Sequence, residues 1–405
     1  MQTFEKYPVR RELADRFEAM VSMRRDLHRH PELGFQEVRT AGVVTKGLEQ
    51  AGLAFRAGIA KTGVATLVPG SGRSGRTVLF RADMDALPIR EESAVEYRSV
   101  HEDTMHACGH DGHTTILLHT LLEAHAGAAR PTVDVKYVFQ PAEEGPGGAK
   151  PMIEEGVLLD PKVEAAFGLH LWNTMPAGKV AVTSGPFMAA ADEFEIRITG
   201  VGGHAAYPHE AVDPVVIGAH VVVALQTLVS RNADPTKTAV VSIGSFHGGS
   251  AFNVLPEEVR MRGTLRTFDD ELRTLLIRRL REVVVGTAGA LGGRAELDFI
   301  DGYPTTVNDP RMAEFVREIA CEVVGAENVL TDLISMGGED MSYFLREVPG
   351  CYFFLGSQDR DRGLDAAHHN PRFDFDEGVM PIGAEIFLRI QDRYLERFPE
   401  PPGQQ

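Results

Sequence analysis

The sequence is poor in cysteine and contains no long apolar run. Three of its 405 residues are cysteines, Cys108, Cys321 and Cys351, and they lie far apart. Such spacing does not predict a disulfide framework and favours a reducing compartment. No segment approaches the roughly 20 apolar residues that span a membrane, and the first residues lack the basic and apolar segments of a signal peptide. We therefore expect a cytoplasmic protein with no membrane partner.

Basic residues are also scarce relative to acidic ones. Lys and Arg number 41 against 58 Asp and Glu, which gives a formal net charge of −17. A charge of this sign repels the phosphates of nucleic acids and of anionic lipids. We therefore expect no nucleic-acid partner. The composition, 43% hydrophobic and 24% charged, is globular, and the length favours two or three domains.

The first part of the chain alternates between strand and helix patterns. Residues 11–51 are predicted to form two helices separated by RRDLHRHPEL, with Pro31 at the break. Strands are predicted at 64–68, 77–80, 133–139 and 165–169, the first two joined as a hairpin. This order indicates an α/β fold with a doubly wound, mainly parallel sheet, whose ligands gather at the carboxyl ends of the strands.

The middle of the chain follows a different order. Strand, helix, strand, strand, helix and strand are predicted at 194–199, 213–230, 239–245, 259–268, 269–288 and 295–299. This is the split βαβ order of a ferredoxin-like α+β module. The alternation of helix and strand resumes after the module. We therefore expect one domain built from 1–186 and 298–405, with a second domain, 187–297, inserted into it.

The segment HACGHDGH, residues 106–113, gathers four histidine and cysteine side chains that can bind a metal, directly before a predicted helix. Imidazole and thiolate both suit zinc or a similar transition ion. Cys108 and His110 are two residues apart, so in an extended segment they project to the same side, and Gly109 lets the backbone bend close to an ion. The segment therefore predicts a metal site.

Other polar side chains follow apolar strands. Glu143 and Glu144 come after one predicted strand, Asp83 and Asp85 after another, and His170 after a third. Adjacent carboxylates at a strand end can divide into a metal ligand and a general base. For the two aspartates, capping of a turn is the alternative. Because parallel strands end at one edge of a sheet, we expect these groups to form one site.

These motifs resemble those of the M20 metallopeptidase family, in its branch of hippurate hydrolases, N-acyl-amino-acid amidohydrolases and auxin-conjugate hydrolases. The resemblance extends over essentially the whole chain. The matching stretches are RRDLHRHPELGFQE, FRADMDALPI, HACGHDGH, FQPAEEGPGGA, GLHLW, GVGGHAAYPH, FNVLPEEV, GTLRTFD, GGEDMSYF and HHNPRFDFDE.

The resemblance implies a set of site residues. The ligands of two divalent ions would be Cys108, which bridges them, with His110, Glu144, His170 and His369. Glu143 would be the catalytic base. His369 directly precedes Asn370 and Pro371, as the family's ligand precedes a small or polar residue and proline, and the adjacent His368 is the alternative. Asp85 would orient a metal-bound imidazole from the second coordination sphere. Asp83 would share that sphere, at the position where other branches of the family place a ligand histidine.

The resemblance also assigns roles within the inserted domain, which would act as a lid and form a homodimer, or a tetramer built from dimers. His204 would come from the partner subunit and help hold the oxyanion. Asn253 and Arg266 would bind the substrate. Arg266 is chemically suited to grip an α-carboxylate through two parallel hydrogen bonds.

The resemblance implies a small-molecule substrate. The implied reaction is metal-dependent hydrolysis of the amide bond of N-acyl amino acids, either hippurate-like or N-acetyl, which releases a carboxylic acid and an amino acid. Zn²⁺ or Mn²⁺ is the expected ion, and Co²⁺ or Ni²⁺ also fits. A dipeptidase or carboxypeptidase, or an N-acetyl-diamino-acid deacetylase, is the nearest alternative. From other classes, the alternatives are a hydrolase with Cys108 as nucleophile and His110 as base, and a metal-binding homologue without turnover.

Overall fold

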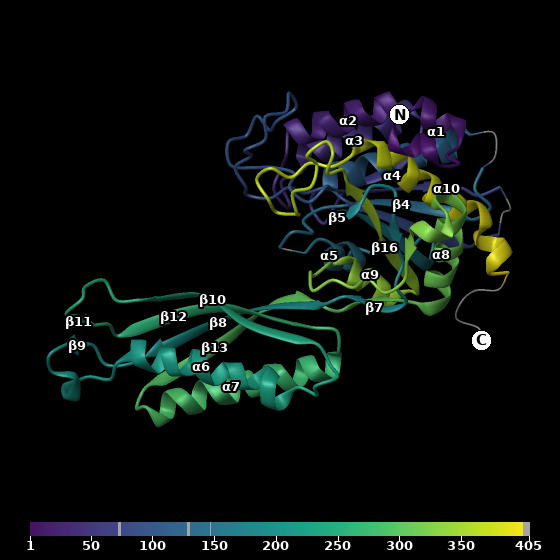
Figure 1. Ribbon diagram of the computed structural model, residues 1–405. Coiled ribbons are helices and arrows are strands. Elements are labelled where there is room, and N and C mark those ends of the chain that lie inside the picture. Colours follow the sequence, from purple (N-terminus) through teal and green to yellow (C-terminus); the bar gives the residue numbers. More distant parts are fainter. Residues whose placement is uncertain (72–73, 128–129, 146, 400–405) are drawn as a thin grey trace. The chain divides into compact units, whose positions relative to one another are not determined.

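A mixed eight-stranded sheet and a separate four-stranded sheet organise the chain into two units (Figure 1). The computed structural model describes residues 1–71, 74–127, 130–145 and 147–399. Unit 1 comprises Met1–Gly185, Val307–Leu333 and Asp340–Gln405, and unit 2 comprises Pro186–Thr306 and Ile334–Glu339. Unit 2 is thus inserted into unit 1. The expected domain limit at residue 297 falls inside strand β13 (Arg294–Tyr303), which belongs to unit 2.

The large sheet of unit 1 has the order β1-β2-β4-β3-β5-β16-β6-β15. Its strands are β1 (Phe55–Ile59), β2 (Gly63–Val68), β3 (Thr77–Asp83), β4 (Asp134–Gln140), β5 (Val163–Pro176), β6 (Val180–Ala181), β15 (Val329–Leu330) and β16 (Gly350–Gln358). The central neighbours β4, β3, β5 and β16 run parallel, and β1 and β2 add antiparallel pairs at one edge. The predicted α/β class with a mainly parallel sheet is confirmed.

The predicted hairpin of residues 64–68 and 77–80 is wrong, because β4 lies between β2 and β3. β4 pairs antiparallel with β2 through Val64 and Phe139, and parallel with β3 through Phe80 and Tyr137. Although β2 and β3 are close in sequence, each of them pairs with the buried strand β4 and not with the other. The position of Asp83 at the end of β3 is unaffected.

The helices of unit 1 cover this sheet (Figure 1). They are α1 (Arg11–Asp15), α2 (Phe17–Arg29), α3 (Val38–Gln50), α4 (His110–Ala126), α5 (Ala149–Glu154), α8 (Pro310–Val324), α9 (Met341–Glu347) and α10 (Met380–Arg397). The segment RRDLHR lies within α2 and not between two helices as predicted. Its Arg24 and His28 are buried and paired with acidic groups, which keeps this polar stretch helical up to Arg29.

Unit 2 is a ferredoxin-like module, as predicted. Its elements are β8 (Ala190–Thr199), α6 (Pro214–Asn232), β10 (Ala239–Gly248), β12 (Glu258–Thr267), α7 (Asp270–Ala290) and β13 (Arg294–Tyr303). The strands form an antiparallel sheet of order β10-β12-β8-β13, with both helices on one face (Figure 1). Asp213 caps α6 by accepting a hydrogen bond from the Val215 N–H at 2.8 Å.

Helix α6 is the one helix, among the described residues, long and apolar enough to cross a membrane by length and composition. One face of α6 packs into the hydrophobic core of unit 2. Ile217, Val221 and Leu225 are buried in the core of unit 2, against the alternating apolar residues of β8 such as Ile196 and Ile198.

Candidate metal centre

Cys108 and His110 are brought together by a turn at Gly109. The expected extended conformation is wrong, because Gly109 has a φ of 90° and His110 is already the first residue of α4. This left-handed conformation costs glycine little. The ligand atoms of Cys108, His110 and His170 all lie within 4.8 Å of one another, so these three buried residues form a first possible set of metal ligands.

His170 lies within β5, and the strand does not end there as predicted, since β5 continues to Pro176. Its orientation is set locally. Nδ1–H donates to the carbonyl oxygen of Leu171 at 2.6 Å, and Nε2 lies 3.5 Å from the sulfur of Cys108. A hydrogen bond from one ring nitrogen to a carbonyl fixes the tautomer that offers the lone pair of the other to a metal.

A second possible ligand set consists of Cys108, Glu144 and His369, again with atoms within 4.8 Å of one another. His369 has a φ of 63°, and its backbone N–H donates a hydrogen bond to Ala107 O at 2.8 Å, which holds this conformation. Its side-chain Nε2 lies 3.1 Å from Glu144 Oε1. The adjacent His368 instead hydrogen-bonds Leu171 O through Nε2 at 2.9 Å. Burial lowers the pKa of His368 to about 4. The structure therefore brings His369, and not His368, to the ligand set.

The two sets fit a pair of divalent cations, because Cys108 belongs to both and could bridge them. The Nε2 atom of His110 is buried and has no hydrogen-bond partner among the described residues, as expected of a donor atom that needs a metal. Burial raises the pKa of the Cys108 thiol well above its usual range, and the Glu144 and Glu143 carboxylates raise it further. A thiolate here requires a nearby cation, so this environment disfavours Cys108 as a free nucleophile.

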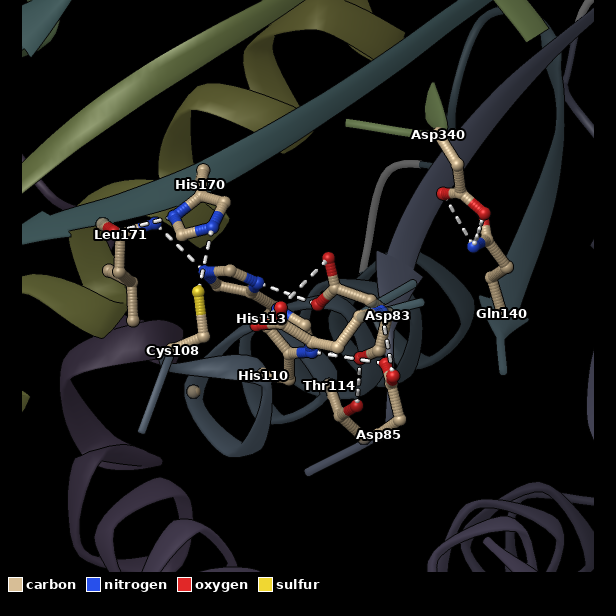
Figure 2. Close-up of polar contacts among 12 residues, drawn as sticks. Asp83, Asp85, Cys108, His110, His113, Thr114, Gln140, His170, Leu171 and Asp340 are labelled. Atoms are coloured by element: carbon tan, nitrogen blue, oxygen red, sulfur yellow. Dashed lines mark hydrogen bonds and ion pairs between the residues drawn. The ribbon is translucent and has the colours of Figure 1, made fainter. Parts of the chain in front are cut away.

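Asp85 connects the two halves of this site. Its Oδ1 accepts a hydrogen bond from His110 Nδ1–H at 3.2 Å (Figure 2). Its Oδ2 accepts from the Glu144 N–H at 2.9 Å. Burial alone lowers the pKa of His110, but Asp83 and Asp85 outweigh it and raise that pKa to about 10. The carboxylates thus create a negative potential that favours a cation. Asp85 has the geometry expected of a group that orients a metal-bound imidazole.

Asp83, His110 and His113 could also hold an ion by distance alone, but their hydrogen bonds argue against it. Asp83 Oδ1 accepts from His113 Nδ1–H at 2.7 Å, and its Oδ2 is paired with Arg81 Nη1 at 2.7 Å. His113 Nε2 accepts the Leu171 N–H at 2.8 Å (Figure 2). Both nitrogens of His113 are therefore used, and the ring braces β5 beside His170.

Sequence reasoning missed the buried charge networks that support this site. Arg81 also donates to Gln140 and Asp340, at 2.9 and 2.8 Å. Arg24 is paired with Asp111 at 2.9 Å, directly after His110 in α4. The available signal was a charged residue within an apolar strand or helix pattern, because an arginine that is buried needs acidic partners.

The three remaining predicted residues lie in unit 2. His204 and Asn253 are neighbours there, since β9 (Gly203–His204) pairs with β11 (Val254–Leu255), and the Ala205 N–H donates to Asn253 O at 3.1 Å. Both side chains are exposed. Arg266 lies on β12 with its side chain half-buried, and that side chain makes no hydrogen bond or ion pair with the part of the chain that the structure describes.

We expect Cys108→Ser to lower the metal content of the purified protein, because a hydroxyl is a far poorer ligand than a thiolate. Elemental analysis measures this, with Cys321→Ser as the matched control, since Cys321 lies in α8, outside both ligand sets. Full metal content combined with lost activity would instead support Cys108 as a nucleophile.

Comparison with known proteins adds four findings. Residues 79–393 match the model of the peptidase family M20/M25/M40. IAA-amino acid hydrolase ILR1-like 4 of Arabidopsis thaliana is 41% identical over 387 residues, 94% of this chain and 87% of that protein. N-acetylcysteine deacetylase of Bacillus subtilis (strain 168) is 36% identical over 378 residues, 93% and 97% of the two chains. The crystal structure of the Bacillus subtilis YXEP protein, a dinuclear metal binding peptidase, aligns with a TM-score of 0.81 and 33% identity, covering 95% of this chain and 100% of that one.

Proposed function

The chain belongs to peptidase family M20/M25/M40 and is a metal-dependent amide hydrolase, and we propose that its substrates are N-acyl amino acids of the hippurate or N-acetyl type. The products are a carboxylic acid and a free amino acid. The observation that carries this proposal is a cysteine shared by two ligand sets, with the buried Glu143 close to His110 and Glu144. A binding protein without turnover would have no use for such a base.

The proposed ligands of the two divalent ions are Cys108, His110, Glu144, His170 and His369. Thiolate and imidazole donors favour Zn²⁺, and Mn²⁺, Co²⁺ or Ni²⁺ could take its place where it is more available. When bound, the ions supply Lewis acidity, which polarises the amide carbonyl and lowers the pKa of a water molecule. Asp85 keeps the His110 ring in one tautomer, and Asp83 holds His113, whose Nε2 accepts the Leu171 N–H next to the proposed ligand His170.

Glu143 is the proposed general base and acid. A carboxylate oxygen of Glu143 takes a proton from the attacking water and later delivers it to the nitrogen of the leaving amino acid. His204 is the proposed donor to the oxygen that becomes negative. Its Nδ1 accepts the Ala206 N–H at 3.0 Å, so the proton lies on Nε2, which has no hydrogen-bond partner among the described residues.

Arg266 is the proposed binding site for the substrate's α-carboxylate. Asn253 lies beside His204, at the opposite end of β12 from Arg266, so we propose that it contacts the substrate from the partner subunit, as His204 does. Burial lowers the pKa of Arg266, although Asp192 and Glu193 oppose this. A half-buried guanidinium without an ion pair favours an anionic ligand. Gly338 leaves space beside it, since a Cβ at this glycine would lie 3.4 Å from Arg266 Nη1. The names of two relatives, which refer to an IAA–amino acid and to N-acetylcysteine, agree with such a substrate.

The substrate class is tested with a panel of N-acetyl amino acids, N-benzoyl amino acids and dipeptides. The enzyme is first treated with a chelator and then loaded with each of the four ions. We expect N-acyl amino acids to be the best substrates. Faster cleavage of dipeptides under every ion would favour a peptidase instead.

We expect Arg266→Ala to raise KM roughly tenfold to a hundredfold for substrates with a free α-carboxylate, the scale of a lost hydrogen bond to a charged group. KM for the corresponding carboxamides should change little. Arg262→Ala is the matched control, because Arg262 lies on the same strand but is exposed and paired with Glu193. Equal effects on acids and carboxamides would remove Arg266 from the substrate site.

We further propose a cytoplasmic homodimer, or a tetramer of dimers, in which unit 1 is the catalytic domain and unit 2 the lid and dimerisation domain. In this arrangement His204 would serve the active site of the partner subunit. The exposure of His204 and its unused Nε2 support a role outside its own unit.

A further inference from the structure

Glu143 lies in a short turn with unusual backbone conformations. Ala142, directly before it, has a φ of 56°, a left-handed conformation that residues with a side chain rarely adopt. The carbonyl oxygen of Ala142 accepts hydrogen bonds from the N–H groups of Gly147 and Gly148, at 2.9 and 3.1 Å. The surrounding structure must hold this conformation in place, because an isolated chain would avoid it.

Two buried carboxylates hold the backbone on either side of Glu143. Glu37 Oε1 accepts the Ala142 N–H at 2.8 Å, and Asp85 Oδ2 accepts the Glu144 N–H at 2.9 Å. The residue between these two anchored amides is the proposed base. Asp85 acts on the metal side of the turn, whereas Glu37 approaches from a segment 105 residues earlier in the chain.

The Glu37 side chain is buried, and hydrogen bonds to both of its carboxylate oxygens hold it in place. It is 0% exposed, and its second oxygen, Oε2, accepts the hydroxyl of Thr62 at 2.6 Å. No cationic side chain in the described ranges is paired with it. Burying a carboxylate without a cation is costly unless its oxygens are satisfied by donors. Both of the bonds found here fix the carboxylate in one orientation toward Ala142.

We infer that Glu37 is a positioning residue for Glu143: it holds the Ala142 amide and so fixes where the carboxylate of the base can reach. This inference rests on the proposed role of Glu143. It assigns a function to the motif PELGFQE, for which neither the ligand sets nor the substrate groups account. A displacement of about 1 Å in a catalytic group can lower the rate a hundredfold, so a single anchoring bond is sufficient to matter.

The test compares Glu37→Leu with Glu37→Gln in the metal-loaded enzyme. Leucine removes the acceptor, and we expect kcat to fall roughly tenfold to a hundredfold, with KM and metal content unchanged. Glutamine keeps an oxygen for the Ala142 N–H and an amide that can donate to Thr62, and its kcat should stay within about threefold of wild type. Equal losses in both variants would overturn the inference, as would a change in KM alone.

Glu32→Leu is the matched control from the same motif. The Glu32 carboxylate also holds backbone amides, those of Arg39 and Thr40 at 2.9 and 2.8 Å, but it does not contact the turn at Glu143. This variant should lower the melting temperature and leave kcat unchanged. If Glu37→Leu does not fold, Thr62→Val replaces it. Thr62→Val should then lower kcat a few-fold at constant KM, and an unchanged kcat would overturn the inference.

A double-mutant cycle shows whether Glu37 acts through Glu143. In a Glu143→Gln background, Glu37→Leu should lower the residual rate by less than about twofold, because the base it positions is already absent. Additive losses would refute the inference. The proposed function fails separately: if Glu143→Gln alone keeps normal activity, Glu143 is not the base, whatever Glu37 does.

Discussion

Glu143→Gln is expected to lower turnover at least about a hundredfold while both ions stay bound. Glutamine has the size of glutamate but cannot accept the proton of the attacking water, and removal of a general base usually costs this much or more. The Glu143 side chain is buried within the group that includes His110 and Glu144, so the metal content must be measured alongside the rate. Steady-state kinetics and elemental analysis of the same sample provide both.

The matched control for this variant is Glu154→Gln. Glu154 is an exposed glutamate at the end of α5, and its substitution should change neither quantity. Near-normal turnover by metal-loaded Glu143→Gln would remove Glu143 from the role of base. Loss of metal together with activity would show that Glu143 is itself a ligand.

Mixing two inactive variants, Glu143→Gln and His204→Ala, is expected to restore about a quarter of wild-type activity once subunits exchange. If His204 serves the partner's site, a mixed dimer has one site with both substitutions and one with neither. Random pairing makes half of the dimers mixed, and half of their sites are intact, which gives about a quarter. Activity is followed over time, and native mass spectrometry measures the exchange.

Glu143→Gln mixed with Cys108→Ser provides the control, because both substitutions lie in unit 1. Every site in such a mixed dimer carries one substitution, so no activity should return. If the mixture with His204→Ala also stays inactive after complete exchange, His204 does not act in the partner's site.

Local signals predicted the architecture well where each element carries its own pattern. In unit 2 the apolar alternation of β8 and the Asp213-Pro214 start of α6 mark elements that occur as expected. The order of strands in unit 1 was harder to predict. The sequence around residues 64–80 does not reveal that β4 separates β2 from β3, because strand pairing depends on residues far away in the chain.

The same limit applies to the metal centre. Cys108 and His110 could be recognised because they are close in sequence and carry metal-binding atoms. Glu37 and His113 act through hydrogen bonds to backbone amides, which any residue type supplies. Such bonds leave no pattern in the partner segment, so only the three-dimensional structure reveals them.

Because unit 2 is inserted into unit 1, its sheet can form during synthesis before the sheet of unit 1 has all of its strands. All strands of its sheet lie between Ala190 and Tyr303, so they are available to one another soon after they leave the ribosome. In unit 1, β5 pairs with β3 on one side, but its other neighbour, β16, spans Gly350–Gln358 and is translated last among the strands. Until then one edge of β5 has unpaired backbone N–H and C=O groups beside apolar side chains, the kind of surface that chaperones protect in nascent proteins.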